Sequence, residues 1–170
     1  MSPAVRIRQE ADDDAQPVHR LLVEAFGGPA EADLVEALRV GGHVLEALVA
    51  EAEAEGEVIG HVLFTRLPIL GPDTRLEAAA LAPLAVTAEF RGQGIGAALV
   101  QAGLEACRGR GLDGVVVLGD PQYYGRFGFT AKAARRIEAP WSGPAFMALA
   151  FSSEVPLDGR AVYAAPFGPS

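Results

Sequence analysis

Three glycines stand close together just before a segment that should form a helix. They are Gly92, Gly94 and Gly96, in the stretch AVTAEFRGQGIGAALVQAGLEA at residues 85–106. Glycine costs roughly 1 kcal/mol relative to alanine inside a helix, so its repeated use here needs a reason. The first N–H groups of a helix lack partners within it and favour phosphate, which bare glycines would let approach. Arg91 would add a charge-assisted contact, and we therefore expect a phosphate site here.

Other interpretations of these glycines are open. They could form a tight turn with close packing of the helix on a sheet. The segment Gly92–Ala97 also fits the dinucleotide fingerprint G-x-G-x-x-[GA], with Asp113 or Asp120 as the ribose-binding acid. Against this, residues 87–91 separate the first glycine from the strand ending at Val86, and later strand–helix repeats are lacking. A nucleoside-triphosphate P-loop is excluded, because G-x-x-x-x-G-K-[ST] does not occur.

Two blocks of sequence together resemble the GNAT superfamily of N-acetyltransferases. Its motif [QR]-x-x-G-x-[GA] is matched by Arg91, Gly94 and Gly96, after the strand PLAV. The second block is LGDPQYYGRFGF, at residues 118–129. The pair is similar to the YhbS-like branch of predicted acetyltransferases, and the likeness extends over residues 4–151. In this family the glycine loop holds the pyrophosphate of acetyl-coenzyme A (acetyl-CoA).

The resemblance implies acetyl-CoA as cosubstrate and assigns residues to its binding. A bulge near Pro83 would separate the strand ending at Val86 from the strand ending at Gly119. The pantetheine arm would then pair with free backbone groups of the first strand, and the N–H of Leu84 or Ala85 would hold the oxyanion. The implied cofactor-binding residues are Leu84, Ala85, Val86, Arg91, Gly92, Gln93, Gly94, Ile95, Gly96, Ala97, Tyr123 and Phe127.

The family reaction is direct attack of an amine on the thioester, and the resemblance implies Tyr124 as general acid for the departing thiol. A thiol has a pKa of about 8.5 and tyrosine about 10, so complete proton transfer is uphill by roughly 2 kcal/mol. Tyr124 would therefore act as a hydrogen-bond donor, or with a lowered pKa. The alternative is that its ring packs a short helix against the sheet, as we expect of Phe127 and Phe129.

The general base is the least defined part of the chemistry. A lysine-like amine, with a pKa near 10.4, needs a base, whereas an α-amine near 7.7–8.0 needs little help. The candidate bases are Glu24 and Glu31, on the helix pair that the resemblance assigns to the acceptor pocket. Glu77 and His61 are further candidates, although His61 in GHVLF fits a structural strand residue better. The three histidines and one cysteine show no metal-ligand spacing, so no metal is expected.

Composition limits the partners and the compartment. The formal net charge is −8, which disfavours a nucleic-acid partner, although backbone amides can still bind a small anion. No apolar run is long enough for a membrane span, no signal-peptide core is seen, and one cysteine fits a reducing cytoplasm. Glu51, Glu53, Glu55 and Glu57 alternate along what we expect to be a solvated face, which could attract a cationic substrate.

The hydrophobic pattern predicts one α+β domain over residues 1–170, with a core at about 4–151 and a C-terminal strand or tail at 152–170. The expected helices are one capped near Asp13 or Asp14, one at 29–40, the glycine helix and a brief one near 121–127. The expected strands are 4–10, a hairpin with its tip at Glu55-Gly56, 75–86, 114–119 and a terminal pair, 134–141 and 145–151. This order predicts α/β/α layers on a mixed, mostly antiparallel sheet, with one parallel β-α-β crossover. The resemblance adds splayed central strands, as in the GNAT fold.

The sequence therefore predicts an acetyl-CoA-dependent N-acetyltransferase of the cytoplasm that acetylates a primary amine. Two other function classes are open: a non-catalytic acyl-CoA-binding or regulatory module on the same fold, and a dinucleotide-binding oxidoreductase. Nothing in the pattern distinguishes a small-molecule amine from a protein N-terminus or lysine as acceptor. The strand AFMALAF and the tail could support the edge of a homodimer.

Overall fold

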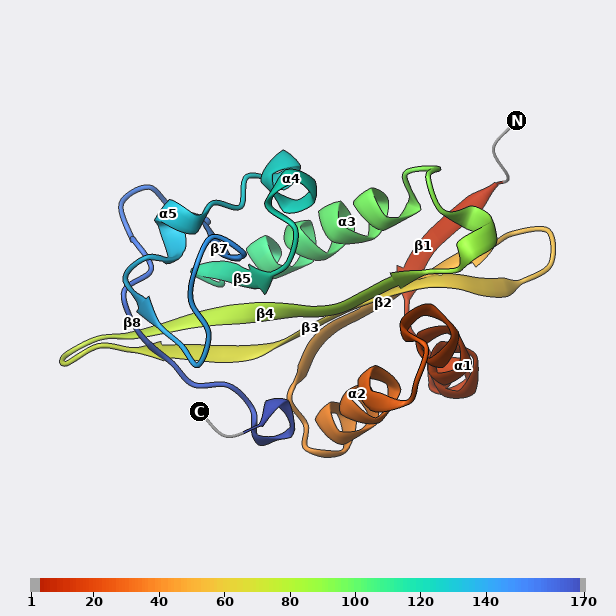
Figure 1. The fold of residues 1–170 in the computed structure, drawn as a ribbon, viewed down its shortest axis with the longest axis horizontal. Coiled ribbons are helices and arrows are strands. Elements are labelled where there is room, and N and C mark those ends of the chain that lie inside the picture. The colour runs from red at the N-terminus through yellow and green to blue at the C-terminus, as the bar shows by residue number, and fades with distance from the viewer. Residues whose placement is uncertain (1–3, 169–170) are drawn as a thin grey trace. The chain divides into compact units, whose positions relative to one another are not determined.

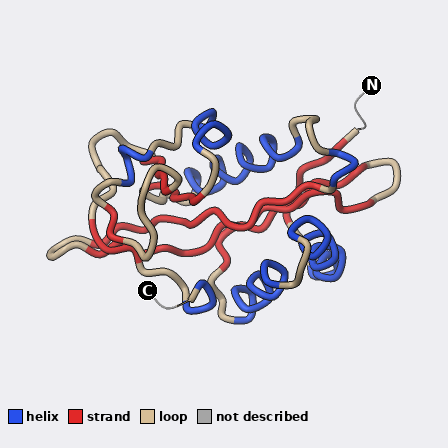
Figure 2. The backbone as a smooth tube through the Cα atoms, in the orientation of Figure 1, coloured by secondary structure: helices blue, strands red, loops and turns tan. Residues whose placement is uncertain are grey.

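The computed structural model (Figure 1) describes residues 4–168, and these divide into two compact units. Unit 1 is built from described residues within Met1–Phe64 and Ala82–Gly103, and unit 2 from those within Thr65–Leu81 and Leu104–Ser170. Figure 2 distinguishes the helices, strands and loops of the chain, and three of the long elements contribute residues to both units. They are strand β3 (Glu57–Leu70), strand β4 (Arg75–Val86) and helix α3 (Ile95–Gly109).

Unit 1 contains the N-terminal elements and the glycine loop. Its further elements are β1 (Val5–Gln9), η1 (Asp12–Asp14), α1 (Ala15–Phe26), α2 (Ala30–Val40), β2 (Val44–Ala52) and η2 (Ala88–Phe90). Strand β1 pairs antiparallel with β2, from Val5 opposite Ala52 to Gln9 opposite Leu48. The strand order continues through β3 to the last part of β4.

The two N-terminal helices begin and end where the sequence signals predicted. Asp14 is the N-cap residue of α1, and Pro17 lies in its first turn, where the missing N–H costs nothing. Gly27 ends the helix in the left-handed conformation, with φ of 72°, which glycine adopts without strain. Apolar residues at helical spacing, Val18 and Leu22 among them, are fully buried. The helices α1 and α2 pack side by side (Figure 1).

Successive residues of β3 face opposite layers of unit 1. A Cβ atom on Gly60 would lie 3.0 Å from a methyl group of Leu99 in α3. The next residue, His61, instead contacts Glu10, which in turn pairs with Arg39 of α2. Because side chains alternate along a strand, α3 covers one face of these strands, and α1 and α2 cover the other. This is the predicted α/β/α layering.

Unit 2 contains the rest of the sheet and several short helices. Its further elements are β5 (Gly114–Leu118), α4 (Pro121–Tyr124), η3 (Gly125–Phe127), α5 (Ala131–Ala134), β6 (Ile137–Glu138), β7 (Phe146–Ala150), β8 (Gly159–Ala161) and η4 (Ala165–Phe167). Strand β5 lies between β4, which is parallel to it, and β7, which is antiparallel. The core of unit 2 is centred on buried apolar residues such as Leu67, Phe146 and Leu157.

The register of the β3–β4 hairpin requires one extra residue in β4. At the turn, the N–H of Gly71 donates to the carbonyl of Thr74; at the far end, the N–H of Thr87 donates to Ile59. Ile59 lies twelve residues before Gly71, whereas Thr87 lies thirteen residues after Thr74. Two strands that pair without a bulge would have equal counts, so β4 contains a bulge between these points. This agrees with the bulge expected near Pro83.

The parallel ladder between β4 and β5 is short. It joins Ala78–Ala80 to Gly114–Val116, although β4 continues for six more residues to Val86. The predicted mixed, mostly antiparallel sheet with a parallel β-α-β crossover is confirmed, since α3 links β4 to β5. A second, two-residue parallel pair between β6 and β8 was not predicted.

The predicted strand over residues 134–141 is wrong in extent. Only Ile137–Glu138 is a strand, and Ala131–Ala134 forms a helical turn instead. A local cap explains the helical turn that replaces the predicted start of the strand at Ala134, because the hydroxyl oxygen of Thr130 accepts the N–H of Ala133 at 3.0 Å. The single domain over residues 1–170 stays a prediction.

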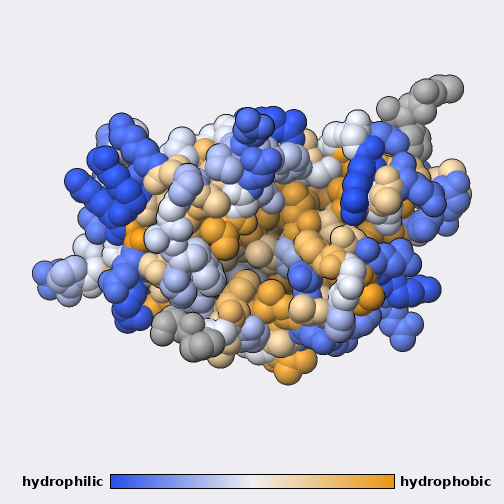
Figure 3. Space-filling model, in the orientation of Figure 1, coloured by the Kyte–Doolittle hydropathy of each residue, from blue (hydrophilic) through white to orange (hydrophobic). Residues whose placement is uncertain are grey.

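The acidic turn between β2 and β3 is a solvated face, as expected. Glu53, Glu55 and Glu57 are exposed, and the surface over this turn is mainly hydrophilic (Figure 3). Glu51 differs, because it is partly covered and pairs with Arg6 and Arg8. Among the described residues, no helix is both long enough and apolar enough to cross a bilayer. The cytoplasmic location stays a prediction.

Candidate active site

The glycine loop of unit 1 has the backbone geometry of a helix start that is open to a ligand. Gly92 and Gly94 have φ of 78° and 81°, values that side-chain-bearing residues rarely adopt. The N–H of Ala98 donates to the carbonyl of Gly94 at 3.0 Å, which is the first helical bond. By helical geometry, the N–H groups of Ile95, Gly96 and Ala97 then have no acceptor inside the helix. The free amides of the helix start therefore lie at residues 95–97, and that they bind an anion stays a prediction.

Close packing does not explain the loop glycines. A Cβ atom on Gly92 or Gly94 would meet no atom within 4 Å. Gly103, further along α3, behaves in the opposite way, because a Cβ there would lie 2.0 Å from the ring of Phe64. Helix–sheet packing thus depends on Gly103, while the loop glycines provide a turn conformation and leave open space.

The side chain of Arg91 joins the loop to the end of β4. Its Nε donates to the backbone carbonyl of Val86 at 3.1 Å. The other four N–H donors of a guanidinium are on the terminal nitrogens, which this bond does not use. Arg91 is exposed, so these donors can turn toward an anion at the loop. Val86 was itself expected to bind the cofactor, and one lone pair of its carbonyl is already engaged.

The last residues of β4 lie after its bulge and lead into the glycine loop. Ala85 is buried, while Leu84 and Val86 are partly exposed. The backbone carbonyl oxygen of Ala85 faces Gly60 of β3, because a Cβ atom added to Gly60 would lie 3.4 Å from this oxygen. The strand end is therefore fixed by β3 on one side.

In unit 2, Tyr124 is held in an aromatic cluster on a short capped helix. A carboxylate oxygen of Asp120 accepts the N–H of Gln122 at 2.9 Å, which begins α4. The ring of Tyr124 meets those of Tyr123 and Phe129 edge to face, with centroids 5.0 and 6.0 Å away. The guanidinium of Arg126 lies 4.6 Å from the ring centroid of Tyr123 and 5.2 Å from that of Phe127.

The protonation of Tyr124 distinguishes the two roles expected for it. Burial raises the pKa of Tyr124 to about 12, and the neighbouring Tyr123 adds to this effect. Full proton transfer to a thiolate would then be uphill by about 5 kcal/mol. The raised pKa favours a hydrogen-bond donor that stays protonated over a Tyr124 with a lowered pKa, and the role of Tyr124 in catalysis stays a prediction. Phe129 is the fully buried packing residue of the group.

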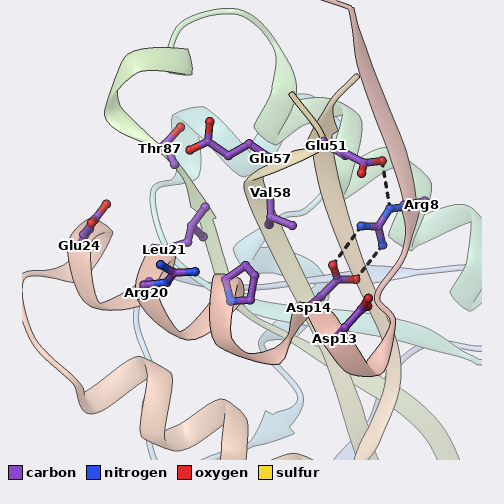
Figure 4. A pocket seen from close by; sticks show the side chains of 12 residues that line it. Arg8, Asp13, Asp14, Arg20, Leu21, Glu24, Glu51, Glu57, Val58 and Thr87 are labelled. Carbon is purple, nitrogen blue, oxygen red and sulfur yellow. Dashed lines mark hydrogen bonds and ion pairs between the residues drawn. The ribbon is translucent and has the colours of Figure 1, made fainter. Parts of the chain in front are cut away.

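The structure separates the candidate bases. Glu24 lines a cavity of about 500 Å³ in unit 1 (Figure 4), whereas Glu31 is not among its lining residues. Glu77 is exposed and pairs with Arg75.

The two acids expected to bind the ribose of a dinucleotide, Asp113 and Asp120, both have local structural roles. Asp113 accepts the N–H of Glu77 at 2.8 Å, and Asp120 caps α4.

His61 belongs to a buried polar network that the sequence did not reveal. Its side chain is fully buried, and its Nε2 lies 3.2 Å from Glu10, which also pairs with Arg39. Burial opposes ionisation of Glu10, but the contacts with His61 and Arg39 outweigh it and keep the pKa of Glu10 below its usual range. The network ties β3 to α2, which fits the structural role expected for His61.

Three side chains of types that can ligate a metal ion lie close together, although their spacing in the sequence did not indicate a metal site. The ligand atoms of His19 on α1, and of Asp33 and Glu36 on α2, lie within 4.8 Å of one another. Both carboxylates are exposed, and exposed acidic groups often meet without a metal. We therefore assign no metal to this group.

Comparison with known proteins identifies the family. The model of the Acetyltransferase (GNAT) family matches residues 15–129. The chain is 42% identical to the uncharacterized N-acetyltransferase YhbS of Escherichia coli (strain K12) over 137 residues, which cover 81% of this chain and 80% of YhbS. It is 40% identical to the uncharacterized N-acetyltransferase YjhQ of the same strain over 116 residues, covering 68% of this chain and 64% of YjhQ.

Solved structures show the same fold. The crystal structure of Escherichia coli YhbS in complex with CoA matches with a TM-score of 0.88 and 35% identity, covering 98% of this chain and 93% of that one. A GNAT-family acetyltransferase from Brucella melitensis, in complex with acetyl-CoA, matches with a TM-score of 0.80 and 33% identity, covering 97% and 99%. The chain therefore belongs to the GNAT family. It is an acetyltransferase, as the sequence predicted.

Proposed function

We propose that this acetyltransferase uses acetyl-CoA to acetylate a primary amine by direct attack on the thioester. The observation that carries the proposal is the start of α3. Gly92 and Gly94 have positive φ and open surroundings there, and the first amides of the helix have no helical acceptor. A diphosphate is the ligand that such a loop favours. The complexes of related proteins with CoA and acetyl-CoA support the assignment.

Three parts of the protein would bind the cosubstrate: the glycine loop with Arg91, the backbone at the end of β4, and two aromatic rings. The amides of residues 92–97, together with the terminal nitrogens of Arg91, would bind the pyrophosphate. Backbone groups of Leu84, Ala85 and Val86 would pair with the pantetheine arm. An N–H of Leu84 or Ala85 would stabilise the oxyanion that develops on the thioester oxygen. Tyr123 and Phe127 would add aromatic contacts with the cofactor.

The reaction balances without a redox partner or a metal. The lone pair of a neutral amine forms a bond to the thioester carbon, and the carbon–sulfur bond breaks. The amine nitrogen loses one proton and the sulfur gains one, so that the products are an amide and a thiol. Tyr124 would donate a hydrogen bond to the departing sulfur while keeping its own proton. For an acceptor that is charged in solution, Glu24 and Glu31 are the candidates to receive the amine proton, and Glu24 is the one that lines the cavity.

Ligand-dependent thermal stability and thiol release test this function. We expect acetyl-CoA and CoA to raise the melting temperature, and NAD and NADP to have no effect. A panel of primary amines should include acceptors that release CoA thiol. Tyr124→Phe should lower kcat at least tenfold and leave the Kd for CoA unchanged.

The outcomes separate the alternatives. Stabilisation by NAD rather than CoA would overturn the proposal in favour of an oxidoreductase. Binding of acetyl-CoA without thiol release for any amine would favour a non-catalytic acyl-CoA-binding module. An unchanged rate in Tyr124→Phe would remove Tyr124 from the mechanism.

A further inference from the structure

A second cavity, of about 410 Å³, lies within unit 2. One wall is α5 with the turn that follows it, and the other is the segment after β7. Ala150 at this second wall pairs with Gly114, the first residue of β5, whereas Tyr124 follows the other end of β5. Between Gly114 and Leu118 the strand spans about 13 Å. The cavity is therefore separate from the position of Tyr124.

The charged residues that line this cavity are all cationic. They are Lys132, Arg135 and Arg136, and none of the described residues in the lining is acidic. Their spacing of three and four residues places them on one side of a helical turn, because Arg135 continues the right-handed helical conformation beyond α5. The formal net charge of the chain is −8, so this concentration of positive charge is a local exception. The cavity therefore favours an anion.

The positive charge of the cavity is not neutralised by the protein. Lys132 and Arg135 make no ion pair with any residue that the structure describes. Arg136 meets Asp158 at 3.9 Å, but the two side chains are 63% and 60% exposed, and such a pair contributes little. Asp158 and Glu154 belong to the segment after β7, but neither lines the cavity. The cations are thus free to contact a ligand.

Two hydroxyl groups of the cavity are positioned as donors. The Oγ1 of Thr130 accepts the N–H of Ala133 at 3.0 Å, and the Oγ of Ser152 accepts the N–H of Glu154 at 3.2 Å. Each oxygen thus has a backbone donor, and its own hydrogen is left to donate. Thr130 and Ser152 are both exposed, so a ligand can reach these hydrogens. A group that only accepts hydrogen bonds, such as a phosphate, suits both the cations and the hydroxyls.

The floor of the cavity is apolar, and its first wall is joined to β7. Leu157 is buried in the core of unit 2, and Ala133 and Ala150 pack against that core. Thr130 and Ala148 exchange two backbone hydrogen bonds of 3.0 Å, which fix the start of α5 on β7. A ligand with an apolar part beside its anionic group therefore meets a preformed surface.

We propose that the cavity between α5 and the segment after β7 binds a small phosphate monoester, at a site that takes no part in acetyl transfer. The phosphate contacts Lys132, Arg135 and the hydroxyls of Thr130 and Ser152, and the organic part lies on the floor at Leu157. A phosphate monoester carries a charge of about −1.5 to −2 at pH 7, which is more than a carboxylate offers to several cations. The net charge of the chain disfavours a nucleic acid as the source of the phosphate.

Three small ligands test the proposal by titration of the whole chain, followed through the NMR shifts of backbone amides. Phenyl phosphate combines the dianion with an apolar ring, inorganic phosphate lacks the ring, and benzoate carries a single charge. We expect phenyl phosphate to shift the amides of residues 130–136 and 150–157 saturably, with a Kd of about 1 mM at low salt. Benzoate should bind about tenfold more weakly and inorganic phosphate about threefold more weakly. The Kd for phenyl phosphate should rise at high salt, because the charges are screened.

The double variant Lys132→Gln, Arg135→Gln locates the site. It should raise the Kd for phenyl phosphate about tenfold, because both unpaired cations are removed. Arg66→Gln, Arg160→Gln is the matched control, since it removes the same charge from exposed residues of unit 2 that do not line the cavity. This control should keep the Kd within about twofold of wild type.

Every other outcome would overturn the proposal. Shifts confined to residues 91–97 would place the phosphate at the glycine loop, and an absence of saturable shifts would remove the site. Equal affinity for benzoate would show that the cavity does not select phosphate monoesters. An equal loss of affinity in both double variants would show only the effect of overall charge. None of these measurements uses CoA or thiol release, so a failure of the proposed acetyl transfer is distinguished from a failure of this site.

Discussion

Gly119 lies directly against the ring of Tyr124: a Cβ atom built on the glycine would be 2.5 Å from Cε2 of the tyrosine. Real Cβ atoms do not approach other atoms so closely, so any larger residue must displace the ring. The glycine that ends the β5 segment therefore helps to set the position of the proposed hydrogen-bond donor. This contact explains a glycine that the sequence alone marked only as the end of a strand.

The first prediction concerns this contact. Gly119→Ala should displace the ring of Tyr124 and lower kcat about tenfold, because a donor misplaced by a fraction of an ångström loses much of its effect. Gly125→Ala is the control, since a Cβ there meets no atom within 4 Å and its φ of −57° suits alanine. Steady-state thiol release on both variants checks the prediction. Equal rates in Gly119→Ala and wild type would show that the position of the ring does not matter.

The second prediction follows from the pKa of Tyr124, which is raised to about 12. A tyrosine with this pKa is only about 1% ionised at pH 10, so it still donates a hydrogen bond there. We expect kcat/KM to rise with pH as the amine acceptor loses its proton, and not to fall again up to pH 10. A descending limb below pH 10 that disappears in Tyr124→Phe would instead indicate a lowered pKa.

The third prediction tests the loop. In Gly94→Ala, the φ of 81° forces alanine into the left-handed conformation at a cost of roughly 1–2 kcal/mol, and the Cβ projects into the open space of the loop. We expect the Kd for CoA to rise at least tenfold. Gly109→Ala is the control in the same helix, because its Cβ meets nothing and its φ is not positive. Calorimetric titration with CoA measures both, and an unchanged Kd in Gly94→Ala would place the diphosphate elsewhere.

Much of the fold could be predicted because it depends on local signals. The strand at residues 75–86 and the helix that follows Pro29 have strong patterns of their own, and both occur with nearly the predicted bounds. The helix start after the glycines was equally clear, because glycines directly before a helical pattern are a residue signature of their own. The helix at Ala131–Ala134 was missed, since a single threonine cap over four residues produces no periodicity.

The polar networks could not be predicted, because their members are far apart in the sequence. Nothing in GHVLF indicates that His61 will meet Glu10, or that Glu10 will also bind Arg39. The cavity of unit 1 has the same character: Glu24 and Glu57 come from a helix and a strand that only the tertiary fold brings together. The sequence offered Glu24 and Glu31 equally as candidate bases on the acceptor side, and a role for either stays a prediction.

The fourth prediction concerns stability and pH at the ion pair between Arg8 and Asp14 in unit 1. The side-chain hydrogen bond from Arg8 keeps the pKa of Asp14 below its usual range, in spite of some burial, and the N–H of Ala11 adds a bond at 2.7 Å. A carboxyl with a lowered pKa stabilises the fold at pH values above its unfolded pKa of about 3.9, and this stabilisation is lost as the pH falls through the folded value. Asp14→Asn should therefore lower the free energy of unfolding at pH 7 by about 2 kcal/mol, since it leaves a partly buried guanidinium with a weaker partner. Below about pH 4 the difference from wild type should shrink, because the Asp14 carboxyl of the unfolded chain is protonated first and that of the folded protein only at lower pH. Urea unfolding of both proteins across this range measures the effect, with the exposed Asp13→Asn as control. A difference that stayed constant down to pH 2 would show that the charge of Asp14 is not what stabilises this corner of the fold.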